Sequence, residues 1–367
     1  MIPMTRLALV YPRLRPPRPR LSPLQKKLGL FRAWASGHPA WISWQVTYRC
    51  QMRCSFCNYW QHPSRPQDEL SVEQFRLASC RLADLGASLI SLAGGEPLLR
   101  GDIVDVVEAV ARYHFPFLTT NGWNATPQLA RELFRVDCWG VSVSLDYADA
   151  ARHDAQRGSP GAFDRAVAAI ETFSLARRHP WQRVNVMCVL VHDNLAEVEK
   201  LLKLAARFDA YFMLQPYADI KTGEERFRAS PGASAELLRL RRHYPNFLSN
   251  PYFLERFDDY LAGRRIPACR AGWAFCNIDE RGDVALCVEH RRRSVGNLLT
   301  TSPADLVAGL RAAARQNTCA NCWYNCRGEI EALYHPWGLF KSLPTYVFNR
   351  GRPSMQPAWN RNSRATS

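Results

Sequence analysis

Three cysteines early in the chain have the spacing of a metal-binding loop. Cys50, Cys54 and Cys57 lie in the segment YRCQMRCSFCNYW, which follows a stretch of strand-like composition. Three thiolates this close together can hold three irons of a [4Fe–4S] cube and leave the fourth iron open to a small chelating ligand. The alternative is a zinc knuckle with His62 as its fourth ligand, although zinc sites usually draw their cysteines from two pairs. We therefore expect a reactive cluster at this loop.

A second set of six cysteines lies in the last third of the chain. They are Cys269, Cys276, Cys287, Cys319, Cys322 and Cys326. In a chain where we expect no secretory signal, such close spacings favour metal thiolates over disulfides. A zinc ribbon is the alternative to an iron–sulfur site here. The other three cysteines, Cys80, Cys138 and Cys188, fall in apolar periodic segments and are expected to be buried as small hydrophobic side chains.

The positive charge of the chain is concentrated at its two ends. The 367 residues carry a formal net charge of +15, yet all 33 carboxylates lie between Asp68 and Glu331. Sixteen of the 48 Lys and Arg residues lie outside that span, which leaves 32 cations against 33 carboxylates within it. A nucleic-acid-binding protein more often spreads its cations over the folded domain. No run of about 20 apolar residues occurs, so we expect no membrane-spanning helix.

From residue 41 onward, strand-like and helical segments alternate. The predicted strands are 41–47, 89–95, 116–122, 140–145, 184–190 and 211–216. The clearest helical segments, in which apolar residues recur every three to four positions, are 72–85, 102–113, 162–178 and 195–208. Ser71 and Asp102 are candidate N-caps. Because this alternation favours parallel pairing with right-handed crossovers, we predict an α/β fold, a partial (β/α)6 TIM-like barrel with its active site at the strand ends.

The alternation stops after residue 220, and the composition then divides the chain. We expect a basic N-terminal arm (1–40), the partial barrel (41–222), a helical bridge (223–265), a small cysteine-rich domain (266–334) and a basic aromatic tail (335–367). Within the cysteine-rich domain, the segment ERGDV predicts a hairpin that turns at Gly282. A last helix over 303–315 is expected to be capped by Ser302.

The motifs at the predicted strand ends resemble those of the radical S-adenosylmethionine (SAM) superfamily. Its signature is the C-x3-C-x2-C loop after the first strand of a partial barrel. The second strand ends in GGEP (94–97), and the third ends in TNG (120–122). The segment SVSLDYADAARHDAQRG (142–158) is similar to the fourth-strand region of many members. The resemblance covers roughly residues 41–220.

This resemblance implies the cofactors and the residues that bind them. The cluster would be a [4Fe–4S] cluster, and one electron delivered to it would split SAM into methionine and a 5′-deoxyadenosyl radical. That radical would attack an unactivated carbon of the substrate. The implied SAM-binding residues are Phe56, Gly94, Gly95, Glu96, Asn121, Ser144, Asp146 and Arg157. Arg157 is the expected partner of the SAM carboxylate, because a guanidinium can bind two carboxylate oxygens at once.

The second set of cysteines resembles the SPASM or twitch extension of these enzymes. Such extensions carry one or two auxiliary iron–sulfur clusters, and six cysteines cannot complete two four-thiolate clusters. We therefore expect one auxiliary [4Fe–4S] cluster. The first choice of ligands is Cys269, Cys287, Cys319 and Cys322, and Cys276 and Cys326 are the alternates. The chain departs from the full SPASM pattern, because no cysteine follows Cys326.

The substrate is less clearly indicated. Acid-free ends rich in Leu, Trp, Phe and Tyr are typical of anchors for an anionic membrane, so we expect a lipid or other apolar substrate. The segment LISLAGGEPLLRGDI also resembles radical SAM enzymes of isoprenoid-lipid metabolism. The protein would then lie in the cytoplasm, attached peripherally to the inner face of the membrane. Tyr217 and Asp219, just past the sixth strand, are candidate substrate-contacting residues.

Two alternatives stay open. SPASM relatives often modify peptides, so a maturase of ribosomally made peptides is the second hypothesis. Only 40 residues precede the first strand, too few for the extra N-terminal peptide-binding domain that such members often carry. A zinc or iron–sulfur nucleic-acid-binding protein is the non-enzymatic hypothesis, with the basic ends on phosphates. The nearly neutral middle of the chain counts against it, and we expect no nucleic acid. The expected electron donor is a flavodoxin or ferredoxin.

Overall fold

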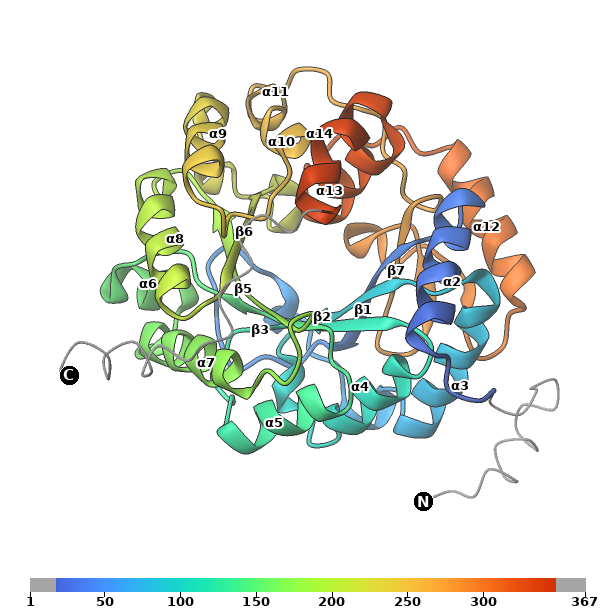
Figure 1. Cartoon of the computed structure of the whole chain (residues 1–367). Coiled ribbons are helices and arrows are strands. Elements are labelled where there is room, and N and C mark those ends of the chain that lie inside the picture. The colour runs from blue at the N-terminus through green and yellow to red at the C-terminus, as the bar shows by residue number, and fades with distance from the viewer. Residues whose placement is uncertain (1–17, 348–367) are drawn as a thin grey trace.

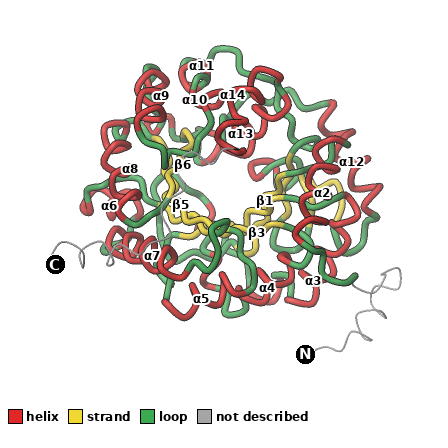
Figure 2. The backbone as a smooth tube through the Cα atoms, in the orientation of Figure 1, coloured by secondary structure: helices red, strands yellow, loops and turns green. Residues whose placement is uncertain are grey.

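The computed structural model describes residues 18–347 and contains one curved sheet. All six predicted strands form, as β1 (Trp41–Thr47), β2 (Leu89–Gly94), β3 (Phe115–Thr120), β4 (Gly140–Ser144), β5 (Arg183–Leu190) and β6 (Tyr211–Pro216). Each pairs in parallel with the next one along the chain. Figure 2 shows these strands as a bent band with helices on its outer side. The predicted partial barrel is therefore confirmed.

The crossover helices cover the outer face of the sheet. They are α3 (Val72–Leu82), α4 (Ile103–Ala111), α5 (Pro127–Arg135), α6 (Ala150–Arg157), α7 (Ala162–Ala176) and α8 (Val198–Arg207). Ser71 caps α3 as predicted, in a capping box with Gln74. Asp102 precedes α4 but makes no capping hydrogen bond, because its carboxylate accepts from Arg100 instead. The sequence analysis did not single out α5 and α6.

The main hydrophobic core lies between the sheet and these helices. Ile42, Trp44 and Val46 of β1 are fully buried there, and the Trp44 ring lies 4.9 Å from the ring of Phe75 on α3. Burial of each such side chain contributes roughly 1.5–3 kcal/mol. Because side chains alternate along a strand, this core determines which residues of each strand face the inside of the barrel.

The inside of the barrel carries buried amides and hydroxyls. The side chain of Gln45 donates to Asn277 Oδ1 over 3.1 Å, and that of Asn185 donates to the Ser142 hydroxyl over 3.1 Å. All four side chains are buried. Within residues 18–347, Asn277 Nδ2 and Asn185 Oδ1 have no hydrogen-bond partner. An unsatisfied buried polar atom costs about 1–3 kcal/mol, so each of these two atoms would be stabilised by a hydrogen-bonding partner.

The C-terminal part of the chain continues the same sheet. β7 (Phe275–Ile278) pairs in parallel with β1, and β8 (Asp283–Ala285) and β9 (Ser294–Asn297) follow antiparallel. The predicted hairpin turns at Gly282, whose φ of +87° suits glycine. The sheet order is thus β6-β5-β4-β3-β2-β1-β7-β8-β9. Helix α12 (Pro303–Arg315) has the predicted bounds and is capped by Ser302.

Five further helices follow β6 or β9 along the chain; the first lies beside α8, and the others lie between the two ends of the bent sheet (Figure 1). They are α9 (Ala233–His243), α10 (Pro251–Leu254), α11 (Phe257–Leu261), α13 (Asn325–Tyr334) and α14 (Pro336–Val347). The N–H of Asn325 points to Gln215 Oε1 of β6 at 3.5 Å, while α13 also contacts β1 and β7. Gly328 lets α13 approach α10 closely, because a Cβ there would lie 2.1 Å from the Phe253 ring.

The N-terminal helix α2 (Pro23–Ala35) precedes the sheet and lies at the periphery beside α12 (Figure 1). Residues 1–17 of the predicted basic arm and 348–367 of the predicted tail, with Phe348 and Trp359, lie outside the described residues. In the part of the chain that the structure describes, no helix is both long enough and apolar enough to span a membrane.

A buried carboxyl joins α13 to the loop before α10. Glu329 accepts hydrogen bonds from the backbone N–H of Asn250 (3.2 Å) and from its side-chain amide. Burial raises the pKa of Glu329 from 4.5 to about 7, and the bonds from Asn250 only partly oppose this shift. Between pH 4.5 and 7 the folded chain therefore keeps a proton that the unfolded chain has released, so stability falls as pH rises through this window.

We predict that Glu329→Gln removes this pH dependence. An amide does not titrate, so the stability of the variant relative to the wild type should rise by up to about 3 kcal/mol between pH 5 and pH 8. Anaerobic urea unfolding at both pH values measures the difference. Parallel pH profiles for the two proteins would show that Glu329 is not protonated in the fold.

Candidate active site

The first cysteine loop is fastened to the end of β2 by backbone hydrogen bonds. The N–H of Gly95 donates to the carbonyl of Thr47, and the N–H of Glu96 donates to that of Arg49, each over 2.8 Å. A Cβ on Gly95 would lie 2.1 Å from the Arg49 carbonyl oxygen, and one on Gly94 would lie 2.0 Å from that of Thr47. The two glycines are therefore required where β2 meets the loop, since any side chain would displace the loop.

Helix α6 holds the other side of the loop. The N–H groups of Arg53 and Ser55 donate to the last carbonyls of α6, at Arg157 (3.2 Å) and Gln156 (3.1 Å). Gly158 ends the helix in the left-handed region, and a Cβ there would lie 2.6 Å from the Arg53 carbonyl. These bonds satisfy helix-end carbonyls that would otherwise lack partners, so the helix and the loop stabilise each other.

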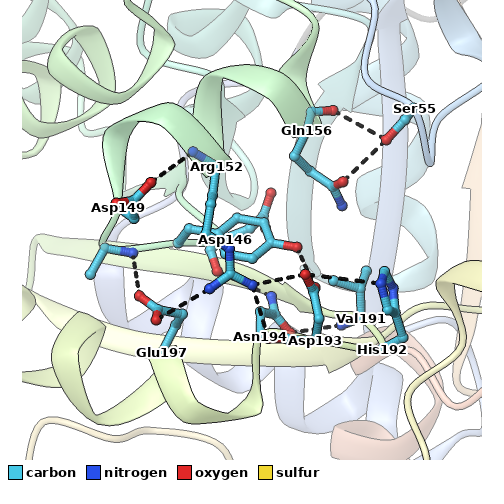
Figure 3. Close-up of polar contacts among 12 residues, drawn as sticks. Ser55, Asp146, Asp149, Arg152, Gln156, Val191, His192, Asp193, Asn194 and Glu197 are labelled. Atoms are coloured by element: carbon cyan, nitrogen blue, oxygen red, sulfur yellow. Dashed lines mark hydrogen bonds and ion pairs between the residues drawn. The ribbon is translucent and has the colours of Figure 1, made fainter.

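A polar network in turn positions α6 (Figure 3). Asp149 caps the helix by accepting from the N–H of Arg152, and the Arg152 guanidinium donates to the Asp193 carboxylate over 2.8 Å. At the far end of the helix, the Ser55 hydroxyl donates to Gln156 Oε1 over 3.2 Å. Segments after β4 and β5 are thereby linked to the cysteine loop.

A buried carboxylate fixes the start of the loop. Glu69 accepts hydrogen bonds from Thr47, from Ser64 (2.7 Å) and from both Nε and Nη2 of Arg49 (2.9 Å each). Burial alone would raise the pKa of Glu69, but the bonds from Arg49, Ser64 and Thr47 outweigh it and hold the pKa below its usual range. Glu69 is thus a charged anchor for the residues that precede Cys50.

The predicted SAM-binding residues Asp146 and Arg157 lie together next to the cysteine loop. Their side chains are buried, and Arg157 Nη2 lies 2.6 Å from Asp146 Oδ2. The guanidinium also lies 5.3 Å from the centre of the Phe56 ring. Burial raises the pKa of Cys54, and Arg157 opposes this shift. Among the described residues Arg157 Nε has no hydrogen-bond partner, which leaves a buried donor for an anionic ligand.

The other predicted SAM-binding side chains line the neighbouring strand ends. Glu96 is fully buried and accepts from the Thr120 hydroxyl (2.7 Å) and from the N–H groups of Asn121 (2.7 Å) and Leu98 (2.9 Å). It therefore ties the end of β2 to the end of β3. Asn121 accepts from the Gln51 amide over 3.2 Å, so it contacts the cysteine loop directly. Ser144 is half-buried at the end of β4.

The three thiols of the loop suit an iron–sulfur cluster. Met52, Cys54 and Phe56 form a small apolar cluster with Tyr217 and other side chains, against which Cys50 and Cys57 pack. Burial raises the pKa of Cys50 to about 12, so a thiolate there needs a bound cation. Soft sulfur donors select iron–sulfur clusters, zinc or copper(I). Across the described residues, no three His, Cys, Asp or Glu side chains converge on a position for a single metal ion.

The structure gathers five of the six later cysteines. Burial raises the pKa of Cys287, Cys322 and Cys326, and neighbouring cysteines add to the shift: Cys322 and Cys269 for Cys287 and Cys326, and Cys269 and Cys319 for Cys322. Cys276 is separate, because it is the residue of β7 that pairs with Ile42 and it joins the outer core. Only burial raises its pKa, to about 12. Because side chains alternate along β7, Cys276 lies on the outer face of the sheet, with Ile42, and not on the inner face.

Arg327, which the sequence analysis did not single out, holds this group together. Its fully buried guanidinium donates to the carbonyls of Cys322 (2.9 Å) and Pro267 (2.7 Å). It also opposes the rise in the pKa of Cys269 and Cys322 that burial causes. Nothing in the sequence marks it, because its importance depends on two loops that are 55 residues apart along the chain.

A charged bridge connects the two cysteine groups. Lys221 Nζ lies 3.4 Å from the centre of the Tyr59 ring and 3.5 Å from Glu289 Oε1, and the Tyr324 hydroxyl donates to the same oxygen over 3.3 Å. Tyr59, Glu289 and Tyr324 each follow a cysteine, at positions 57, 287 and 322, by two residues. Burial opposes the charge of Lys221, but Tyr59 and Glu289 outweigh it and raise its pKa.

The predicted substrate-contacting residues lie on the loop that leads to Lys221. Tyr217 is buried against Phe227 beside the first cysteine loop, and its hydroxyl shares a hydrogen bond with Thr222. Asp219 forms an ion pair with Arg228. Lys221, rather than Asp219, is thus the charged residue of this loop that approaches the cysteine groups.

We predict that Lys221→Met destabilises the fold by about 3 kcal/mol, because it leaves the Glu289 carboxylate buried without a cation. The matched control is Lys203→Met, whose ammonium is 63% exposed and pairs with Glu199 across one helical turn. The control should show no measurable loss in anaerobic urea unfolding. Equal losses of stability for both variants would mean that Lys221 stabilises the fold no more than an ordinary surface ion pair does.

Comparisons with known proteins agree with this geometry. A family profile described as the Radical SAM superfamily matches residues 44–205. The mycofactocin maturase MftC of Mycolicibacterium smegmatis is 28% identical over 323 residues, which cover 82% of this chain and 80% of that protein. The AdoMet-dependent heme synthase of Methanosarcina barkeri is 32% identical over 209 residues, covering 54% and 57%.

A solved structure shows the same fold over most of the chain. Streptococcus suis SuiB, in complex with the precursor peptide SuiA, superposes with a TM-score of 0.59 at 16% identity. The superposition covers 81% of this chain and 73% of SuiB. Residues 44–205 thus match the radical SAM superfamily, and the chain is an enzyme that uses SAM and a [4Fe–4S] cluster and has a cysteine-rich C-terminal region of the auxiliary-cluster kind.

Proposed function

We propose that this enzyme modifies an unactivated carbon of a peptide. The observation that carries the proposal is the match to a maturase over 82% of this chain. The likeness to a structure that holds a precursor peptide supports it. The lipid or apolar substrate expected from the basic, aromatic ends is less well supported, because none of the relatives described above is named for a lipid.

The inside of the barrel supports a peptide as well. Asn185 Oδ1 and Asn277 Nδ2 are a buried acceptor and a buried donor without partners among the described residues. Asn325, at the start of α13, has a buried side-chain oxygen and a buried side-chain nitrogen, and neither has a hydrogen-bond partner among the described residues. Peptide groups carry one donor and one acceptor each, so they match such amides, whereas a hydrocarbon chain would leave them unsatisfied.

Different residues would bind the cluster and the different parts of SAM. When bound, SAM and the cluster at Cys50, Cys54 and Cys57 supply a carbon-centred radical through one-electron cleavage of the SAM sulfonium. Arg157 would bind the SAM carboxylate with its free Nε, and Phe56 would contact the adenine. The buried aromatic and aliphatic side chains around the loop exclude water, which keeps a reactive group from being quenched.

For the auxiliary site we propose a single [4Fe–4S] cluster in residues 266–334. Its ligands are Cys269, Cys287, Cys319 and Cys322, and Cys326, which is half-buried beside them, is the alternate. Cys276 lies on the outer face of the sheet, so it is the least suited of the six cysteines to ligate the cluster. A flavodoxin or ferredoxin is the proposed electron donor.

We predict that Cys54→Ala abolishes SAM cleavage, because two thiols cannot hold the cluster with one open iron. The readout is 5′-deoxyadenosine formed by the reconstituted enzyme with dithionite in the absence of air. Cys80→Ala is the matched control, since Cys80 is a buried cysteine of α3 outside both groups, and it should keep wild-type cleavage. Cleavage by the Cys54 variant at the wild-type rate would contradict the assignment.

The substrate class is tested by supplying separate peptide and lipid fractions of a host extract to the reconstituted enzyme. We predict that the peptide fraction, but not the lipid fraction, yields a new product by mass spectrometry. Asn185→Leu should lower product formation about tenfold, as expected for the loss of about 1.4 kcal/mol of hydrogen bonding, while SAM cleavage without substrate stays unchanged. Products found only in the lipid fraction would restore the lipid hypothesis.

A further inference from the structure

Helix α2 turns three large apolar side chains outward. Leu24, Leu28 and Phe31 are 66%, 60% and 63% exposed, and their spacing of four and three residues puts them on one face. The opposite face holds the small residues Gly29 and Ala33. A Cβ on Gly29 would lie 2.9 Å from the backbone N of Ala87, so the helix sits close to the body on that side.

This arrangement is the reverse of an ordinary surface helix, which directs its apolar stripe to the core. The buried position one helical turn before Gly29 is a lysine. Lys26 is only 7% exposed, and its ammonium donates to the carbonyl of Ala111 over 3.0 Å. The inner face of α2 packs closely against the body of the protein. The exposure of the apolar stripe is therefore not a result of poor packing of this helix.

Cations flank the exposed stripe. Lys27 and Arg32 lie at its two edges, both exposed, and Lys27 has no acidic partner within residues 18–347. No carboxylate occurs before Asp68 in the sequence, while 11 Lys and Arg do. A stripe of Leu and Phe between cations matches the chemistry of an anionic lipid surface, in which acyl chains lie beneath negative headgroups.

Helix α2 contacts the end of α13, and the helix that follows α13 exposes further aromatic side chains. The Trp34 ring lies 5.9 Å from that of Tyr334, the last residue of α13. The next helix, α14, exposes Trp337 and Phe340, which stack with their ring centres 5.5 Å apart. Aromatic residues of this kind favour the boundary between water and acyl chains.

We propose that the outer face of α2, formed by Leu24, Leu28, Phe31, Lys27 and Arg32, binds peripherally to an anionic membrane. A second copy of this chain fits the face less well, because a two-fold contact would bring the cations of one α2 against those of the other, and α2 itself carries no carboxylate to pair with them. The inference is independent of the substrate, since α2 lies outside the barrel.

Vesicle flotation of the full-length protein tests the proposal. Vesicles contain either 30% phosphatidylglycerol in phosphatidylcholine or phosphatidylcholine alone. We expect binding to the anionic vesicles, at least a tenfold loss of binding for the double variant Leu28→Glu/Phe31→Glu, and weakened, less salt-dependent binding for Lys27→Glu. The matched control is Leu175→Glu on α7, where the leucine is 62% exposed, and it should bind like the wild type.

Three results would overturn the proposal. The first is no binding of the wild type to anionic vesicles, and the second is binding that the double variant does not weaken. The third is a dimer in light scattering without lipid that the double variant converts to monomer, which would make the face a protein interface. Unchanged thermal melting of the variants, expected because the substituted side chains are exposed, ensures that lost binding is not unfolding.

Discussion

The close approach of the first cysteine loop to the end of β2 is the contact on which the site depends. Gly94 and Gly95 allow the carbonyls of Thr47 and Arg49 to come within hydrogen-bond distance of the next strand's backbone. From the other side, the last carbonyls of α6 accept from the loop. The loop therefore takes its conformation from two crossover connections of the barrel. Three thiols in a flexible loop would not be held in one arrangement otherwise, since ordering each residue costs about 1–2 kcal/mol.

The two cysteine groups are held in place relative to each other by strand pairing and by a buried charge bridge. β7 pairs directly with β1, so the segment that leads to the second group is hydrogen-bonded to the strand that leads to the first. The Lys221 ammonium then contacts both the Tyr59 ring and the Glu289 carboxylate. Such buried charges are costly to bring out of water, and each is stable only while its partners stay in place. Movement of either group would separate the charges, so the bridge resists it.

The chain separates polar and apolar surfaces in an uncommon way. Its barrel interior holds amide atoms of Asn185 and Asn277 that lack partners among the described residues, while helix α2 exposes Leu28 and Phe31. An interior of this kind suits a substrate rich in hydrogen-bonding groups, and an exterior of this kind suits a surface. The apolar signal at the chain ends, which suggested an apolar substrate, thus has an explanation that does not involve the barrel at all.

The order of strands and the first cysteine loop follow from local patterns. Alternating apolar residues and clear caps such as Ser71 and Ser302 are short-range signals, so all six barrel strands and α12 could be predicted within a few residues. The C-x3-C-x2-C spacing, GGEP and Arg157 are equally local, and the structure places them side by side. Helix α6 was harder to recognise because it is short and polar, with only His153 and Arg157 buried.

Long-range contacts decided the rest. Arg327 and Lys221 look like ordinary surface cations in the sequence, and only the fold shows that one clamps Cys322 to Pro267 and the other faces Glu289. The separation of Cys276 from the other cysteines depends on the pairing of β7 with Ile42, because a shift of one residue would reverse the face on which it lies. Spacing along a chain determines which atoms can be neighbours locally. Which distant atoms share a buried, weakly screened environment is determined by the folded packing alone.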